Sequence, residues 1–146
     1  MPFQFKLEPL ITIRDNELKE KQAELAKAYE ARRIVEDMGK KVEAEIAENI
    51  EAGREMITGG GVIQPDYLLG LRRQEMFLLA QRKDIQDKMQ MLDEEIERRR
   101  DAVIEANKSL KTVERLKDRR YEKYQLEERR KETISMDEVA GQRRAV

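Results

Sequence analysis

Apolar residues recur with a heptad period along the first part of the chain. If Ile11 opens the first heptad, about eight of the fourteen a and d positions up to Met56 are apolar. The a positions are Ile11, Leu18, Leu25, Arg32, Gly39, Ile46 and Gly53, and the d positions are Arg14, Lys21, Ala28, Val35, Val42, Asn49 and Met56. The pattern predicts a coiled-coil helix from about residue 9 to residue 57, with an interrupted seam.

A second and more regular seam starts at Leu68. Between Leu78 and Val113, only Arg82 and Arg99 interrupt the apolar a and d positions. The apolar members are Leu71, Leu78, Ile85, Met89, Leu92, Ile96, Val103, Ala106, Leu110 and Val113. Beyond them the pattern weakens, because the next large apolar residues fit no single register; these are Leu116, Tyr121, Tyr124 and Leu126. We predict a second helix from about residue 66 to residue 134, followed by a tail over residues 135–146.

The two predicted helices differ in length. At 1.5 Å per residue, the first spans roughly 70 Å and the second roughly 100 Å. If a turn joins them antiparallel, the second helix passes the start of the first, and residues 116–134 have little of this chain to pack against. The predicted fold is all-α: a single domain, residues 1–146, that forms a two-helix antiparallel coiled-coil hairpin with an extended C-terminal helix.

The segment TGGGVIQPDY, residues 58–67, separates the two seams. A phosphate-binding loop needs a lysine after the glycines and a strand before them, and this segment follows a predicted helix and has no such lysine. Glycine after one helix and proline at the start of the next are common stop and start signals, so we predict a turn over residues 58–65. Val62 and Ile63 are apolar where a turn favours polar residues, so the turn is also predicted to be a docking tip.

Two glycines, Gly39 and Gly53, fall on a positions inside the first predicted helix. Each costs about 1 kcal/mol relative to alanine in a helix. Either the partner helix approaches closely at these positions, or the glycines are simply tolerated. The sequence leaves both interpretations open.

The composition favours long helices over a broad globular core. Charged residues make up 42% of the chain and aromatic residues 5%, with no tryptophan. The chain has no cysteine and no histidine, so it lacks the commonest zinc ligand and the commonest general base. Neighbouring carboxylates such as Asp93, Glu94 and Glu95 are expected to be solvated, because a two-helix fold has no enclosed pocket. We expect no enzyme activity, no cofactor and no metal site.

No segment of the sequence predicts a targeting signal or a membrane span. The start, MPFQFKLEPL, lacks the basic and apolar regions of a signal peptide, and no apolar run approaches about 18 residues. With 30 basic and 31 acidic residues, the net charge is −1, and bulk charge therefore predicts no binding to nucleic acid or to membranes. We expect a cytoplasmic protein without direct membrane insertion.

Charge is distributed unevenly along the chain. Residues 43–55 hold five acidic residues and one basic residue, a net charge of −4, whereas residues 108–132 hold ten basic and six acidic residues, a net charge of +4. The basic segment interleaves arginines with Tyr121 and Tyr124, which is compatible with nucleic-acid contact. It also fits a solvated helix with ion pairs such as Lys123–Glu127 and Glu127–Lys131, or a surface that binds a protein partner.

Three stretches of the chain resemble the flagellar export protein family FliJ. They are the start FQFKLEPLITIRDNELKE, the turn together with the Tyr- and Leu-rich beginning of the second predicted helix, and the end LKTVERLKDRRYEKYQLEERRKETISMDEVAGQRR. The resemblance implies a component of the flagellar type III export apparatus, located in the cytoplasm and peripheral to the inner membrane at the flagellar base. The implied partners are the hexameric export ATPase, the cytoplasmic domain of the export-gate membrane protein, and export chaperones.

The resemblance assigns different partners to the two ends of the hairpin. The open end is predicted to sit in the ATPase ring through Phe3, Phe5, Leu7, Leu10, Arg115, Arg119, Arg120, Tyr121 and Tyr124. The tip is predicted to contact the export gate through Met56, Ile57, Val62, Ile63, Tyr67, Met76 and Phe77. Two alternatives remain: a structural coiled coil that forms homo-oligomers, and the equivalent stalk of an injectisome type III secretion system. A prefoldin-like chaperone would require strands between the helices, for which the turn leaves no room.

Overall fold

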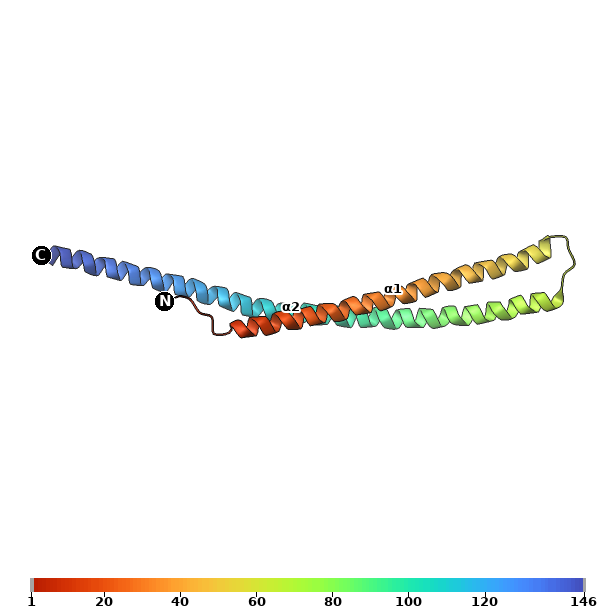
Figure 1. The fold of residues 1–146 in the computed structure, drawn as a ribbon, viewed down its shortest axis with the longest axis horizontal. Coiled ribbons are helices and arrows are strands. Elements are labelled where there is room, and N and C mark those ends of the chain that lie inside the picture. The colour runs from red at the N-terminus through yellow and green to blue at the C-terminus, as the bar shows by residue number, and fades with distance from the viewer. Residues whose placement is uncertain (1, 146) are drawn as a thin grey trace. The chain divides into compact units, whose positions relative to one another are not determined.

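Two helices make up nearly the whole chain in the computed structural model, which describes residues 2–145 (Figure 1). Helix α1 spans Glu8–Thr58 and helix α2 spans Pro65–Ala145. No strand occurs among the described residues. The described residues divide into two compact units. We call Ala23–Asp101 the hairpin unit, and residues 2–22 with 102–145 the terminal unit.

In the hairpin unit, α1 and α2 lie side by side and run antiparallel (Figure 1). Val42 and Ile46 of α1 pack with Leu78 and Ile85 of α2, and Leu78 is the most buried of them, with 1% of its surface exposed. Because a helix pair buries one stripe of each helix, the core is a single seam. The predicted all-α helical hairpin is confirmed.

The predicted heptad positions form this seam along both helices. All fourteen a and d positions from Ile11 to Met56 are buried or half-buried, including the glycines and the polar residues. The same holds for the second seam from Leu68 to Val113, including Arg82 and Arg99. The periodicity therefore predicted correctly which side of each helix faces the other.

Polar residues of the hairpin unit's seam bridge the two helices. Asn49 Nδ2 donates a hydrogen bond to the carbonyl oxygen of Leu71 at 3.0 Å. Arg32 Nε donates to Asp93 Oδ1 at 2.7 Å, and Arg99 donates through Nη1 to the carbonyl oxygen of Glu24. In addition, Arg82 Nη1 lies 3.6 Å from Glu43 Oε1. These contacts give four polar seam residues partners across the interface and link specific residues of α1 to specific residues of α2.

The turn has the chemistry that its glycines and proline predict. Helix α1 ends where the Gly59 N–H donates to the carbonyl oxygen of Glu55 at 2.8 Å. Gly60 follows with a φ of 71°, in the left-handed region that glycine adopts without steric cost. Pro65 then begins α2, where its missing N–H costs no helical hydrogen bond. The observed connection, residues 59–64, lies within the predicted turn.

In the terminal unit, Leu110 and Val113 continue the buried seam of α2. The prediction that residues from 116 onward have little to pack against is wrong for residues 117–124. Residues 2–7, which precede α1, carry Phe3 and Phe5 onto this part of α2, and Lys117 Nζ lies 2.8 Å from Glu8 Oε2. The sequence pattern did not predict this because six non-helical residues have no heptad period.

The predicted tail over residues 135–146 is wrong for residues 135–145, because α2 continues to Ala145; residue 146 lies outside the described part. Ser135, Asp137 and Gly141 are weak helix formers, which favoured an earlier end. However, extending an existing helix carries no nucleation cost, and the segment contains no proline to stop it. Arg143 and Arg144 in the last turn also interact favourably with the helix dipole. All described residues from 129 onward are exposed.

Candidate protein-binding surfaces

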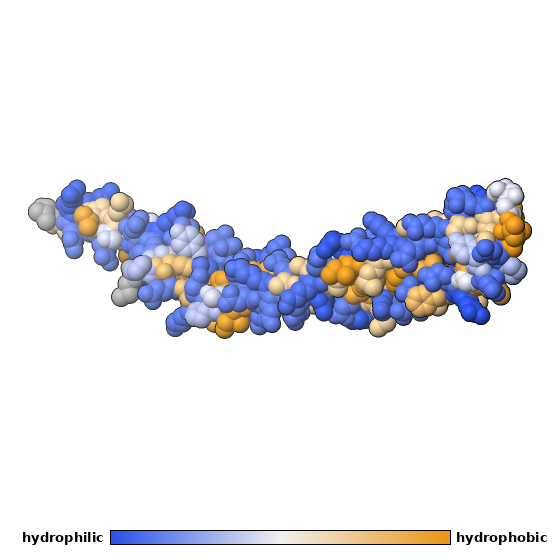
Figure 2. All heavy atoms as spheres, turned by 45° about the vertical axis from the view of Figure 1, so that its right-hand side comes forward, coloured by the Kyte–Doolittle hydropathy of each residue, from blue (hydrophilic) through white to orange (hydrophobic). Residues whose placement is uncertain are grey.

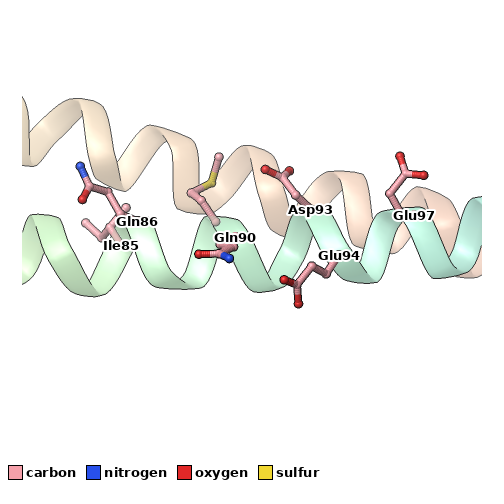
Figure 3. Close-up of a pocket in the computed structure, with 7 residues that line it drawn as sticks. Ile85, Gln86, Gln90, Asp93, Glu94 and Glu97 are labelled. Atoms are coloured by element: carbon pink, nitrogen blue, oxygen red, sulfur yellow. The ribbon is translucent and has the colours of Figure 1, made fainter.

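The hairpin unit has open grooves along its helix pair. One groove follows α2 beside the seam and is lined by Ile85, Gln86, Met89, Gln90, Asp93, Glu94 and Glu97 (Figure 3). Figure 3 shows Asp93 and Glu94 pointing in different directions, and Asp93 is held by Arg32. Within residues 2–145, no three acidic side chains are grouped so that they could hold a metal ion. The carboxylates therefore do not converge on one point.

Charged side chains of the hairpin unit pair mostly with neighbours on their own helix. Hydrogen bonds from Arg98 and then Arg99 hold the pKa of Glu95 below its ordinary value. A hydrogen bond from Arg33 likewise lowers the pKa of Glu30. The hydrogen bond to Asp93 raises the pKa of Arg32. These exposed pairs stabilise the helices modestly, as i,i+3 and i,i+4 pairs do, and none has the geometry of a catalytic pair.

At the tip, the structure brings together three of the seven residues predicted to contact the export gate. Met56, Val62 and Tyr67 line one shallow hollow together with residues of the turn. Figure 2 shows hydrophobic residues gathered at the end of the hairpin unit where the two helices are joined. Val62 is 88% exposed and Ile57 63% exposed, so these apolar side chains have little cover from their own chain. Ile63 and Tyr67 are also exposed.

A second apolar group at the tip lies on the side of α2 that faces away from α1. Met76 is 66% exposed and Phe77 is 58% exposed. Leu69, which was not among the predicted gate contacts, is exposed as well. It precedes Met76 by seven residues and therefore lies on the same face of the helix. That spacing is the sequence signal that would have identified Leu69.

At the other predicted surface, the N-terminal segment and α2 form an aromatic cluster. The Phe3 ring centroid lies 5.2 Å from that of Tyr121, in an edge-on arrangement, and 5.5 Å from that of Tyr124. Arg120 Cζ lies 5.5 Å from the centroid of the Phe5 ring, and Phe5 is buried. These geometries are typical of aromatic and cation–π contacts. The cluster joins residues that are about 120 positions apart in the sequence.

The remaining residues predicted for the ATPase surface lie outside this cluster. Leu7, the last residue before α1, and Leu10, in its first turn, are half-buried. The Leu7 carbonyl oxygen accepts hydrogen bonds from the N–H groups of Leu10 and Ile11. Arg115 and Arg119 are exposed on α2. The predicted set therefore divides into a packed aromatic cluster, two half-buried leucines and two solvent-facing arginines.

Comparison with known proteins gives one match that covers almost the whole chain. The family model described as Flagellar FliJ protein matches residues 3–145. No match was found among curated proteins or among solved structures. No helix within residues 2–145 is long and apolar enough to cross a membrane. On the strength of the match, the chain belongs to the flagellar FliJ protein family, whose members are components of the flagellar type III export apparatus.

Proposed function

We propose that this chain is a non-enzymatic stalk or adaptor that binds the hexameric flagellar export ATPase and links it to the export gate and to export chaperones. It would work in the cytoplasm, peripheral to the inner membrane at the flagellar base. The observation that carries the proposal is the group of exposed apolar side chains at the tip, which includes Val62, Met76 and Phe77. A clustered apolar surface that the chain itself leaves open is typical of a protein-binding site.

The tip is the part that we assign to the export gate. Its contacts would be Met56, Ile57, Val62, Ile63, Tyr67, Met76 and Phe77. Their side chains extend from the end of α1, the turn and the start of α2, so a globular partner can contact all three. The outward position of Met76 and Phe77 leaves them accessible while Leu71 and Leu78 hold the helix pair together.

The gate assignment is tested by replacing Val62, Ile63 and Phe77 together with serine. Because these side chains are exposed, the variant should keep its helicity by circular dichroism. It should lose binding to the purified cytoplasmic domain of the gate in a pull-down. A control with Ile34 and Met91 replaced by serine, two exposed apolar residues away from the turn, should bind normally. Retained gate binding by the tip variant would contradict the assignment.

We assign the open end of the hairpin, in the terminal unit, to the ATPase ring. The supporting observation is that α2 presents exposed Arg115, Arg119 and Tyr121 there, while Phe3 and Phe5 hold the N-terminal segment against the same stretch of helix. Reversible polar contacts suit a stalk whose partner subunits change conformation in turn, since such contacts form and break with little desolvation cost.

The ATPase assignment is tested with two truncated chains. Deleting residues 115–146 removes the proposed contacts on α2 and should abolish stimulation of the export ATPase. Deleting residues 125–146 keeps the aromatic cluster and should leave stimulation intact, which makes it the matched control. Circular dichroism should show that the helices persist in both. Unchanged ATPase stimulation by the shorter chain would refute the assignment.

A further inference from the structure

One side of the hairpin unit carries an open groove between α1 and α2. Four apolar residues line it: Ala31 and Val35 of α1, and Met91 and Leu92 of α2. Met91 is 68% exposed. Ile34 and Met38 follow Ala31 by three and seven residues, so they lie on the same side of α1, and both are exposed. We call this side of the hairpin unit the groove side.

Charged residues of α2 on the groove side are arranged with opposite signs about Met91. The row is Asp84, Lys88, Met91, Glu95 and Arg98, and its intervals of three and four residues keep it on one helix face. Asp84 precedes Met91 by seven residues, and the oppositely charged Arg98 follows it by seven. Lys88 precedes it by three, and the oppositely charged Glu95 follows it by four. Reversing the direction of the row therefore places an opposite charge at each position.

The charges of this row remain accessible to another molecule. Lys88 Nζ lies 3.2 Å from Asp84 Oδ2, and Arg98 Nη2 lies 2.6 Å from Glu95 Oε2. The side chains of Asp84 and Arg98 are about two-thirds exposed, and even that of Glu95 is 35% exposed. A partner can therefore contact both pairs without breaking a buried interaction. The row contains two acidic and two basic residues, so it has no net charge that would attract nucleic acid or an anionic membrane.

We propose that the groove side binds the groove side of a second copy of this chain, with the two α2 helices antiparallel. Met91 then meets Met91 of the second copy. Lys88 lies opposite Glu95 of the second copy, and Asp84 lies opposite Arg98 of the second copy. A parallel arrangement would place each charge against the same charge, which is unfavourable, so the row selects the antiparallel one.

The contribution of α1 makes this dimer a weak one. Ile34 and Met38 add apolar surface beside Met91. However, Lys27 and Lys41 lie seven residues to either side of Ile34, so in an antiparallel dimer they face each other with like charge. Small interfaces of this kind form transient complexes. The dimer uses none of the residues assigned above to the export gate or the ATPase, so the inference goes beyond the proposed function.

The test is sedimentation velocity of the full chain at protein concentrations from roughly micromolar to millimolar. The wild type should be monomeric at the lower end and dimeric at the upper end. M91E and M91K should each stay monomeric throughout, because a charge would meet the same charge at the centre of the interface. An equimolar mixture of M91E and M91K should dimerise, because opposite charges then meet. M136E, which changes an exposed methionine of the terminal unit, is the matched control and should associate like the wild type.

Disulfide cross-linking tests the orientation, because the chain has no cysteine of its own. A mixture of K88C and E95C should form a disulfide-linked heterodimer under mild oxidation. K88C alone should not, because antiparallel helices would hold its two copies about 10 Å apart along the axis, beyond the reach of a disulfide. Cross-linking of K88C alone as fast as in the mixture would contradict the antiparallel arrangement.

Three further outcomes would overturn the inference. A wild type that stays monomeric up to millimolar concentration forms no such dimer. If M91E dimerises like the wild type, or if the mixture of M91E and M91K stays monomeric, Met91 does not meet its own copy. If an export chaperone binds the wild type but not M91E while the wild type alone stays monomeric, the groove side binds the chaperone; the inference then fails, while the proposed function stands.

Discussion

Replacing Gly39 with alanine is expected to stabilise the hairpin unit. A Cβ built at Gly39 would lie 3.4 Å from Cγ2 of Ile85, at the short end of ordinary van der Waals contact. Gly60 is the only glycine of the described residues with a positive φ, so alanine fits the backbone of residue 39 without strain. The helix propensity gained is about 1 kcal/mol. Because the new methyl group neither clashes nor leaves a void, we expect a net gain of about 1 kcal/mol in unfolding free energy.

Gly53→Ala should have a similar effect, and the two should add. A Cβ at Gly53 would lie 3.9 Å from Cδ1 of Leu71, which is an ordinary van der Waals contact. The two glycines are roughly 20 Å apart along α1, and substitutions at that separation usually contribute independently. The double variant should therefore gain about 2 kcal/mol. For a chain of this length, the melting temperature should rise by about 4–8 °C.

The assay is thermal and urea unfolding followed by circular dichroism at 222 nm. Gly60→Ala is the control, because its φ of 71° makes alanine unfavourable by about 1 kcal/mol. Gly59→Ala should destabilise as well, since its Cβ would lie only 2.6 Å from the carbonyl oxygen of Glu55. The reasoning is refuted if Gly39→Ala lowers the urea midpoint while Gly53→Ala raises it. That result would mean that the packing of Ile85 requires a residue without a side chain at position 39.

Three further predictions follow from the hairpin unit. Leu78→Ala should lower the unfolding free energy by about 2–5 kcal/mol, because Leu78 is the most buried side chain; a urea midpoint within error of the wild type would contradict this. Asn49→Leu should raise the urea midpoint and produce a dimer that sedimentation velocity detects at a concentration where the wild type is monomeric, because it removes the hydrogen bond to Leu71 that favours one pairing of the helices. A variant that stays monomeric would argue against this role of Asn49. The lowered pKa of Glu95 adds stability that is present above its ordinary pKa of 4.5 and is lost as the pH falls through the lowered value. Glu95→Gln should therefore reduce the loss of stability measured by urea unfolding at acid pH, and an unchanged pH dependence would count against the pairing with Arg98.

The heptad pattern predicted the hairpin well because its a and d positions are the ones that are buried between the two helices. Arg32 and Gly39 looked like interruptions in the sequence, yet both lie in the seam. Arg32 reaches across to Asp93, and Gly39 packs beside Ile85. A period of 3.5 residues identifies the side that faces the partner helix, but it does not reveal how a polar residue on that side is satisfied.

The candidate surfaces were predicted unequally well. Val62 and Phe77 were recognised because an apolar residue in a turn, or on the outer side of a helix, stands out from the pattern. At the open end, the aromatic and basic residues were grouped because an antiparallel hairpin brings the start of the chain beside the second helix, and the grouping did not distinguish buried from exposed side chains. The structure separates Phe5, which is buried against α2, from Arg115 and Arg119, which face solvent. That distinction depends on where the six residues before α1 lie.

The sequence by itself determined the helical class, the turn and the residues of the seam, because each follows from periodicity or from local backbone preferences. The sequence pattern placed the end of α2 too early, because a helix that has already formed can continue through residues of weak helix propensity. Only the tertiary structure decided that Phe3 packs against Tyr121 and Tyr124, and that Lys117 pairs with Glu8. These are contacts between distant segments, and no local pattern in the sequence encodes them.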